Sequence, residues 1–427
     1  MKNIIDIEIQ DIISGDNPNS KQIDHIVTLH TVDSDIILNR VHYIEHLRDY
    51  NENIGDYSLI RFGVTAGYYI TKIHPYRGNL ELSIDNRRYK LVLMSHNENI
   101  DASLLSRMSP EELDKASLLE LEGQLLLREL EALRNSYVDG VYRDITIKDL
   151  LYGVFFNLCE DIQIEGSNLD LNIDIVDPVN ELEFPHIVLP TGLKAMSLPS
   201  YLQNKAPGVY NGAIGTYLQD YRDKLTLFVY PLYTAERFNT ATRKVLFYHP
   251  NTHYYNLLES SYRVDGDIIK ILAGTDTENH DIASDNLINK GESIISSNPE
   301  QVLNRNVDIG DDDITYDKSK QVKGITLEGR QDGYKKARYL PNSSNIYYTR
   351  SKLIRDTMMV YRITWRYSNP SLIYPGMPCV FIFEKDAKLV KYYGTIQYLY
   401  TKYDGVEKTY NSMIVIMVSR YHNNEDE

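Results

Sequence analysis

The sequence predicts an α+β fold rich in β-strands, with an α/β domain inserted between two strand-rich parts and a long acidic excursion in the second part. Three observations support this prediction. Apolar and polar residues alternate along much of the first 98 residues and again after residue 216, which is the period of strands with one buried face. Between these parts the apolar spacing becomes helical. From residue 274 to residue 345 apolar residues become sparse.

The first strand-rich part is expected to span residues 1–98. Turn residues separate its alternating segments, which favours a small antiparallel barrel or sandwich. The predicted strands are Ile23 to His30, Ile36 to Leu38, Leu59 to Thr71, Leu80 to Ile84 and Tyr89 to Met94.

The inserted α/β domain is expected to span residues 99–215 and to begin with a long helix over 110–134. Ser109 can cap this helix, Pro110 suits its first position, and two glutamates follow in its first turn. A second helix is predicted from Ile147 to Leu158, because its apolar residues recur at helical spacing. We expect the two helices to pack against each other.

The second strand-rich part is expected to consist of residues 216–273 and 346–422. Its predicted strands are Leu225 to Tyr230, Lys244 to Tyr248, Ile268 to Leu272, Met358 to Trp365, Pro378 to Phe383, Leu389 to Tyr400 and Met413 to Val418. The segment 274–345, rich in Asp, Glu, Ser, Asn and Gly, is interpreted as an acidic and partly mobile insertion. Residues 423–427 form a polar tail.

The segment from Ile145 to Tyr233 contains short elements in a characteristic order. They are the helix from Ile147, the alternating strand Leu169 to Ile175, the line HIVLPTG, a helix around Ser200 to Leu202, the turn Gly208 to Tyr210, and the strand that Pro231 ends. A PGMP turn at residues 375–378 and a GTI strand at 394–396 follow later. This order resembles the baseplate central hub proteins of contractile-tailed bacteriophages, a tail hub family shared with related contractile injection systems.

The resemblance implies two tail-tube-like antiparallel β-barrel domains in each chain. It implies a homotrimer that forms a ring and adapts the sixfold tail tube to the threefold spike. The implied partners are the tail spike protein, the tail tube or a tube-adaptor protein, and the surrounding baseplate proteins. DNA would pass through the ring without specific binding during viral genome ejection. The implied location is the tail baseplate of the virion, after assembly in the host cytoplasm.

Composition disfavours tightly bound nucleic acid and a membrane as partners. The net charge of −15 disfavours a protein that grips nucleic acid, because phosphate binding requires Lys and Arg. No apolar run approaches the roughly 20 residues that span a bilayer, so no membrane segment is expected. Cys159 and Cys379 lie far apart in apolar stretches and are interpreted as small core residues.

Few residue patterns suggest chemistry, and we predict no catalytic residue, no cofactor, no metal ligand and no enzyme activity. The residues His42, Glu45 and His46 match an inverted zinc-peptidase pattern, which requires both histidines on one helix. A short solvated helix or a strand-end loop is the favoured interpretation of this segment. The pair His249 and His253 flanks a proline, which argues against a helix there. The acidic run from residue 308 to residue 313 does not match a calcium-loop pattern.

Basic and aromatic residues gather at residues 335–338 and 350–355. This patch favours contact with an acidic protein surface over nucleic acid or carbohydrate. For the ring itself, the strands around Phe62 to Tyr69 and Leu225 to Tyr230 are the predicted contacts. We predict that Trp365 and Phe381 are buried and anchor the core. Two other functions stay open, namely a different tail structural or carbohydrate-binding accessory protein and, more remotely, a zinc metallopeptidase.

Overall fold

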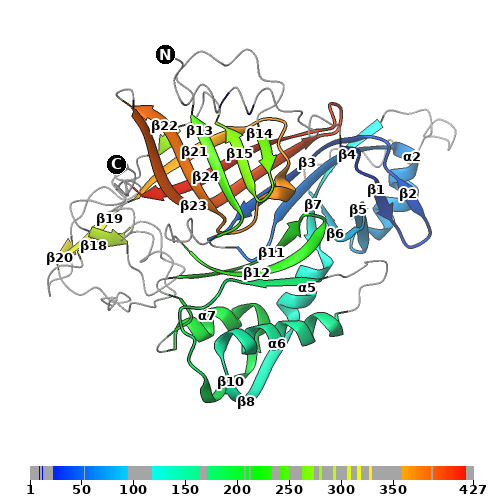
Figure 1. The fold of residues 1–427 in the computed structure, drawn as a ribbon. Helices are drawn as coiled ribbons and strands as arrows, with labels where there is room; N and C mark the ends of the chain where they lie inside the picture. The colour runs from blue at the N-terminus through cyan, green and yellow to red at the C-terminus, as the bar shows by residue number, and fades with distance from the viewer. Residues whose placement is uncertain are drawn as a thin grey trace.

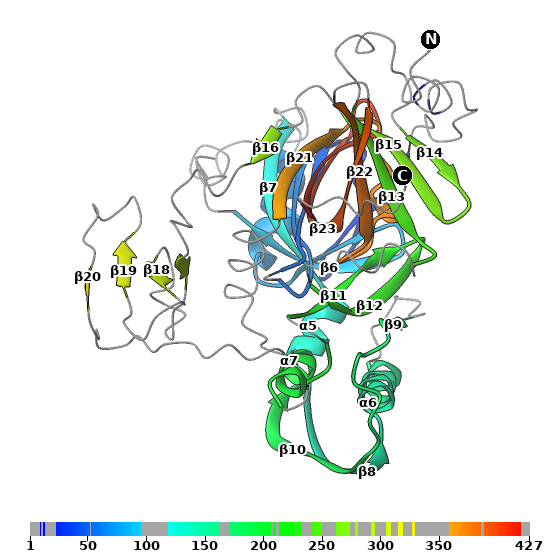
Figure 2. The ribbon, with the colours of Figure 1, turned by 60° about the vertical axis from the view of Figure 1, so that its left-hand side comes forward.

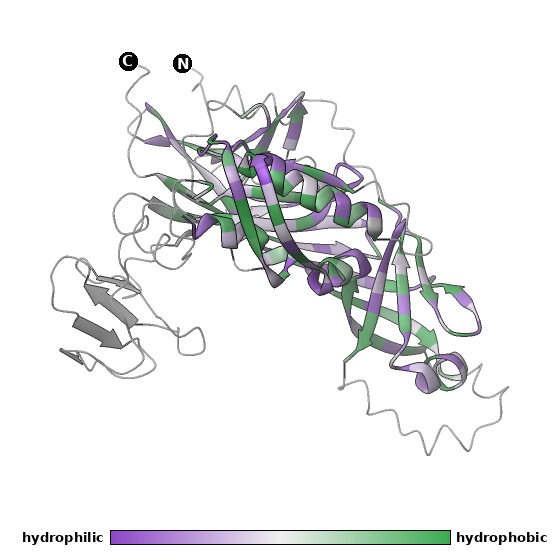
Figure 3. Cartoon of the chain, turned by 90° about the horizontal axis from the view of Figure 1, so that it is seen from below, coloured by the Kyte–Doolittle hydropathy of each residue, from purple (hydrophilic) through white to green (hydrophobic). Residues whose placement is uncertain are grey.

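A computed structural model shows a β-rich protein built on one large curled sheet (Figure 1). The structure describes residues 23–51, 53–94, 118–162, 171–205, 208–210, 213–232, 241–249, 262–273, 358–385 and 388–419, with Ile9, Ile12 and short strands between residues 278 and 328. Hydrophilic and hydrophobic residues alternate along the strands (Figure 3), as the sequence pattern predicted for a sheet with one buried face.

The first half of the sheet contains seven strands around one apolar core. The strands are β1 (Val27–His30), β2 (Asp35–Ile37), β3 (Val41–Asp49), β4 (Tyr57–Thr65), β5 (Leu80–Ile84), β6 (Arg87–Leu93) and β7 (Leu118–Leu127). Their order in the sheet is β3-β4-β7-β6-β5-β1-β2. The short helical turns α2 (Ala66–Tyr68), η1 (Tyr69–Ile73) and η2 (His74–Tyr76) follow β4, so the strand predicted up to Thr71 ends earlier.

The long helix predicted over 110–134 is wrong over residues 118–127 and confirmed over residues 128–134. Residues Leu118–Leu127 form strand β7, and the helix α5 covers only Arg128–Asn135. Leu121 and Leu125 fit one face of a helix, but a spacing of four residues also keeps two side chains on one face of a strand. Pairing with β4 on one side and β6 on the other decides the outcome.

The second half of the sheet surrounds a larger core. Its strands are β13 (Lys244–His249), β14 (Tyr262–Asp265), β15 (Ile268–Leu272), β16 (Glu278–His280), β21 (Met358–Trp365), β22 (Pro378–Lys385), β23 (Lys388–Asp404) and β24 (Thr409–Ser419). Strands β11 (Ile214–Tyr221) and β12 (Lys224–Pro231) form a separate three-stranded sheet with β9 (Asn172–Ile175), and side chains from both contribute to this core. The 3-10 turn η6 (Pro370–Leu372) precedes β22. These strands confirm the segments predicted after residue 225. However, β13 runs parallel to both β15 and β22, so the pairing is mixed and not purely antiparallel.

The long strand β23 joins the two halves into one continuous sheet. Its first part, up to Thr395, pairs with β22, and its last part, from Tyr398 to Asp404, pairs with β3 of the first half. A register irregularity between Ile396 and Tyr398 lies where β23 changes partner. Accordingly, Ile396 contributes to the second core and Tyr403 to the first.

In the residues that the structure describes, the inserted unit has three α-helices around a third core. Its elements are α5 (Arg128–Asn135), β8 (Tyr137–Ile145), α6 (Ile147–Asp161), β9 (Asn172–Ile175), β10 (Phe184–Lys194), the turn η4 (Ala195–Ser197) and α7 (Leu198–Gln203). Helix α6 confirms the helix predicted from Ile147, and Thr146 caps it by accepting a hydrogen bond from the Asp149 N–H at 3.1 Å. Figures 1 and 2 both place β8, β10, α6 and α7 beyond β11 and β12, away from the large sheet.

Most of the predicted acidic insertion, 274–345, lies outside the described residues. Within it the structure places β16 and the small sheet of β17 (Glu292–Ile294), β18 (Arg305–Asp308), β19 (Thr315–Lys318) and β20 (Leu327–Glu328). Strand β16 pairs with β21 and so extends the large sheet. The polar tail 423–427 also lies outside the described residues.

Candidate functional site

The strands predicted as ring contacts are buried inside the chain. In β12, Leu227 and Val229 belong to the core of the inserted unit, while Phe228 and Tyr230 belong to the second core. Phe62, at 0% exposure, is buried in the first core. A side chain that its own chain covers cannot contact a neighbour, so Phe62 and the side chains Leu225 to Tyr230 are excluded as ring contacts. Thr65 is exposed and Tyr68 is partly exposed, so for these residues the contact stays a prediction. The apolar run from Leu227 to Tyr230 in β12 reflects burial on both faces of the strand.

The predicted core anchors are confirmed. Trp365 is 0% exposed and packs edge-to-face against Tyr262, with ring centroids 5.0 Å apart. Phe381 is 2% exposed and stacks on Tyr361 at 4.4 Å. Both residues belong to the second core, where aromatic side chains from distant strands meet.

An exposed apolar cluster lies at the end of the large sheet. Strand β2 ends the strand order and pairs only with β1 among the described strands. Ile26, Val32 and Ile37 are 62%, 64% and 60% exposed. Ile37 stands opposite Thr28, so Ile26, two residues before Thr28, lies on the same sheet face. We call Ile26 and Ile37 the β2 edge cluster, while Val32 lies in the turn at the other end of the β1–β2 hairpin. Unpaired sheet edges and exposed apolar patches are features of protein interfaces.

A buried charged group connects the first half of the sheet to β11. Arg48, on β3, is 6% exposed, and its Nε donates to Asp56 Oδ2 at 3.0 Å. The Tyr217 hydroxyl, on β11, donates to Asp56 Oδ1 at 3.0 Å. His46 Nδ1 lies 2.8 Å from Ser58 Oγ. Residues from two distant parts of the chain therefore share one carboxylate.

The electrostatics of this group follow from its burial. Burial opposes the charge of Arg48, but Asp56 more than offsets this effect, so the pKa of the guanidinium lies above its ordinary value. Burial lowers the pKa of His46 to about 4, and Asp56, at 3.6 Å, opposes this shift only in part. At neutral pH the group therefore contains one ion pair and a neutral imidazole.

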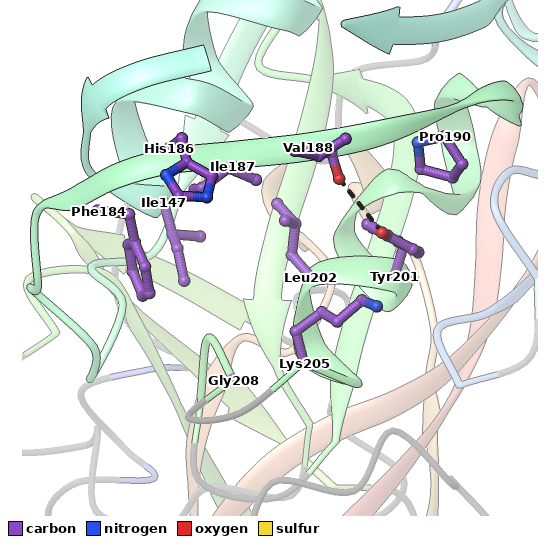
Figure 4. A pocket seen from close by; sticks show the side chains of 10 residues that line it. All are labelled: Ile147, Phe184, His186, Ile187, Val188, Pro190, Tyr201, Leu202, Lys205 and Gly208. Atoms are coloured by element: carbon purple, nitrogen blue, oxygen red, sulfur yellow. Dashed lines mark hydrogen bonds between the residues drawn. The ribbon is translucent and has the colours of Figure 1, made fainter. Parts of the chain in front are cut away.

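The described residues contain a pocket of about 370 Å³ in the inserted unit (Figure 4). It lies between β10, α7 and the start of α6 and is lined by Ile147, Phe184, His186, Ile187, Val188, Pro190, Tyr201, Leu202, Lys205 and Gly208. Ile147 and Leu202 are buried, whereas His186 and Lys205 are exposed. The Lys205 ammonium lies 4.9 Å from the centre of the Tyr201 ring. The site therefore combines an apolar cavity with one ammonium group, that of Lys205.

The inverted zinc-peptidase pattern lies in strand β3 and not in the predicted helix or loop. In a strand, positions four residues apart are separated by about 13 Å, and Glu45 faces the side opposite to His46. His42 Nε2 lies 3.5 Å from Glu120, and His46 contacts Ser58. The helical arrangement that the zinc hypothesis requires does not exist at these residues. Within the part of the chain that the structure describes, no group of three or more His, Cys, Asp or Glu is placed to hold a metal ion.

Several other predicted features lie partly or wholly outside the described residues. These are His253, the acidic run after Asp308, and the basic segments 335–338 and 350–355. Both cysteines are free thiols. Cys379 is buried as predicted, whereas Cys159 is only partly buried, and burial raises the pKa of the Cys159 thiol to about 12.

Two histidine-centred contacts escaped sequence reasoning because each includes a residue that is far away in the chain, Asp85 and Tyr410 for His25 and Ser83 for His30. His25 lies 2.7 Å from both Asp85 Oδ2 and the Tyr410 hydroxyl. His30 lies 2.8 Å from Asp35 Oδ1 and 3.0 Å from Ser83 Oγ. The side chains of Asp35, His30 and Ser83 have the connectivity of a hydrolase triad. The carboxylates that flank Ser83 have partners of their own, Glu81 with Arg88 and Arg128, and Asp85 with His25.

None of the helices in the described ranges combines the length and apolar character that crossing a bilayer requires.

No protein-family model and no curated protein matches this sequence. A tail protein from Neisseria meningitidis MC58 aligns over 92% of this chain and 96% of its own, at 10% sequence identity and a TM-score of 0.41. The 43 kDa tail protein of prophage MuSo2 from Shewanella oneidensis aligns over 92% and 96%, at 8% identity and a TM-score of 0.43. An E. coli component of the type VI secretion system, described as structurally similar to bacteriophage T4 tail proteins, aligns over 92% and 77%, at 10% identity and a TM-score of 0.40.

Proposed function

We propose that this protein is a structural component of a phage tail or a related contractile injection machine, and that it forms the central hub of the baseplate. The observation that carries the proposal is the single curled sheet in which β23 joins two strand-rich halves. One chain can then occupy two neighbouring positions in a ring. The order of α6, β9, β10, α7 and β12 agrees with the order on which the hub resemblance rests.

In this proposal three copies form a closed ring of six similar halves. Such a ring adapts the sixfold tail tube, or a tube adaptor, to the threefold spike, and surrounding baseplate proteins hold it from outside. Closed cyclic symmetry also prevents open-ended polymerisation. The role is mechanical, without a catalytic step, and the excess of acidic residues suits a channel through which DNA passes without binding.

The β2 edge cluster is the ring contact that this proposal assigns in place of the buried strands. A sheet edge can extend its hydrogen bonding to a neighbouring chain. Exposed apolar side chains beside that edge add burial on assembly. Ile37 lies on the edge strand itself, so a charge at this position would oppose both contributions.

The test is the solution mass of the purified chain, measured by light scattering with and without the spike protein from the same genome. We expect a trimer that captures the spike, and a monomer for Ile37→Lys with unchanged circular dichroism. Val141→Lys is the matched control, because Val141 is 59% exposed on β8, which Figures 1 and 2 place beyond β11 and β12 and away from the large sheet. A monomeric wild-type chain that ignores the spike would refute the hub role. A trimeric Ile37→Lys variant would refute only the assigned contact.

A further inference from the structure

Two arginines from distant parts of the chain meet over one tyrosine ring beside the β11–β12 turn. Arg222 lies in this turn, and Arg243 directly precedes β13. Their guanidinium carbons lie 5.6 and 5.4 Å from the centre of the Tyr221 ring. The Arg222 N–H donates to the Ser371 carbonyl at 3.1 Å. The Tyr374 hydroxyl donates to the Arg243 carbonyl, also at 3.1 Å. The backbone of each arginine is therefore held in place.

The turn that carries Arg222 has a backbone conformation that does not suit arginine. Tyr221 pairs with Lys224, which leaves Arg222 and Asp223 as a two-residue hairpin loop. Their φ angles are +48° and +65°, in the left-handed region where Asn and Gly are preferred. An arginine in this conformation costs free energy, and such strained residues cluster at functional sites. The strain has an explanation if function requires the guanidinium at this position.

The two guanidinium groups are only partly neutralised within the chain. Both contact the same carboxylate oxygen, Asp267 Oδ1, which lies 3.6 Å from Arg222 Nη1 and 3.7 Å from Arg243 Nε. Both distances exceed the length of a charge-assisted hydrogen bond, which is about 2.7–2.9 Å. The two arginine side chains are 36% and 40% exposed, so N–H donors of both remain open to a ligand. Two cations therefore share one acidic group.

The surrounding charges leave a local excess of cations. The β11–β12 and β14–β15 hairpins and the start of β13 contain six basic and four acidic side chains, which are Arg222, Lys224, Arg243, Lys244, Arg263 and Lys270 against Asp220, Asp223, Asp265 and Asp267. Outside this set, Arg87 pairs with Asp220 at 2.7 Å. Arg263 and Lys270 pair with Asp265. The excess favours one additional anion, whereas the carboxylates around the site oppose a polyanion such as nucleic acid.

We propose that Arg222 and Arg243 form a binding site for a single carboxylate, which an aspartate or glutamate side chain of a partner protein supplies. The carboxylate lies beside Asp267 and accepts hydrogen bonds from both guanidinium groups, whose planar N–H forks match its two oxygens. The site lies beside the β14–β15 hairpin, at the opposite end of the strand order from β2. The proposal therefore depends neither on the ring contact nor on the hub role.

Arginine footprinting with phenylglyoxal tests the site in the full-length chain. The reagent modifies accessible guanidinium groups, and mass spectrometry measures the modified fraction of each arginine separately. Acetate is the probe, because it reproduces the side-chain carboxylate of aspartate, and chloride at the same ionic strength is the reference. We expect acetate at about 0.1 M to slow the modification of Arg222 and Arg243 by at least about twofold, the effect of half occupancy. Arg134, exposed at the end of α5, is the internal control and should react equally in both salts.

The variant Arg222→Gln shows whether the two arginines act together. It removes one of the two charges, so we expect acetate to protect Arg243 no longer. Equal modification rates of the wild-type chain in acetate and in chloride would overturn the proposal. Acetate protection of Arg243 that persists in Arg222→Gln would also overturn it. Stronger protection by a short DNA duplex than by acetate would assign the site to nucleic acid instead.

A purely structural ion pair is the alternative explanation of this arrangement. If Arg222 serves only to pair with Asp267, its loss should lower the urea concentration at which half of the chain unfolds. The variant Arg222→Asn removes the charge and introduces a residue that tolerates a positive φ. We expect its urea midpoint to equal or exceed that of wild type, while acetate protection of Arg243 disappears. A lower midpoint would show that Arg222 stabilises the fold and would overturn the binding role.

Discussion

Replacing Arg48 by Met is expected to lower the free energy of unfolding by about 3 to 5 kcal/mol. Arg48 is 6% exposed, and its Nε donates to Asp56 at 3.0 Å. At an effective dielectric constant of about 20, two unit charges at this distance attract each other by about 5 kcal/mol. The substitution to Met removes that attraction and leaves the carboxylate of Asp56 without the charge of Arg48 beside it. The Tyr217 hydroxyl can still donate to Asp56 but supplies no charge.

Urea unfolding followed by tryptophan fluorescence measures this loss. Trp365 is the only tryptophan of the chain and is 0% exposed in the second core, so its emission reports the unfolding of that core. The matched control is Lys148→Met. Lys148 pairs with Asp177 at 2.6 Å, but the two side chains are 50% and 83% exposed, and we expect a loss below about 1 kcal/mol.

A double variant tests the cause of the loss. Arg48→Met combined with Asp56→Leu removes both charges, so we expect it to be less unstable than Arg48→Met alone, because no buried charge is left without its partner. An Arg48→Met variant within about 1 kcal/mol of wild type would show that solvent screens Asp56 and would refute the reasoning.

Two further predictions concern pH and packing. Because burial lowers the pKa of His46 to about 4, the folded chain binds this proton less readily than the unfolded chain does. The stability contribution is complete above about pH 6.5 and is lost as pH falls toward 4; in urea titrations at several pH values, wild type should lose up to about 3 kcal/mol more than His46→Asn over this window. Gly394→Ala would place a Cβ 1.9 Å from the Met417 carbonyl oxygen, so we expect little soluble protein on expression. Gly153→Ala in α6 is the control, because a Cβ there meets nothing within 4 Å. We expect its free energy of unfolding to equal that of wild type or to exceed it by up to about 1 kcal/mol, and its melting temperature to be no lower. A normal yield of Gly394→Ala, or a wild-type pH profile for His46→Asn, would contradict the corresponding prediction.

Sequence patterns predicted the strands whose inward positions are apolar. Strand β3 was missed, because its inward face continues from Ile44 to His46 and Arg48, and two polar residues hide the alternation. These polar residues are tolerated only because Asp56 and Tyr217 meet them from other parts of the fold. Strand β3 is therefore defined by tertiary contacts and not by a local pattern of residues.

The short phrases behind the hub resemblance have physical reasons that the structure supplies. Gly376, in the PGMP turn, has a φ of +64°, a conformation that L side chains rarely adopt. A Cβ on Gly376 would also approach the Tyr230 ring to 2.4 Å. The sequence identified the residues as turn formers, but only the fold shows that β12 packs over the turn.

By itself, the sequence determined the composition, the acidic charge, the period of most strands and the helix from Ile147, because these depend on residues that are close in the chain. It could not determine the strand β7, the change of partner along β23, or the pocket beside β10. Each of these depends on which distant segment lies alongside, and strand pairing and burial are set by such neighbours and not by local preference. Local sequence does not distinguish β2 from β12 as exposed or buried. Tertiary contacts cover β12 and leave the edge at β2 in water.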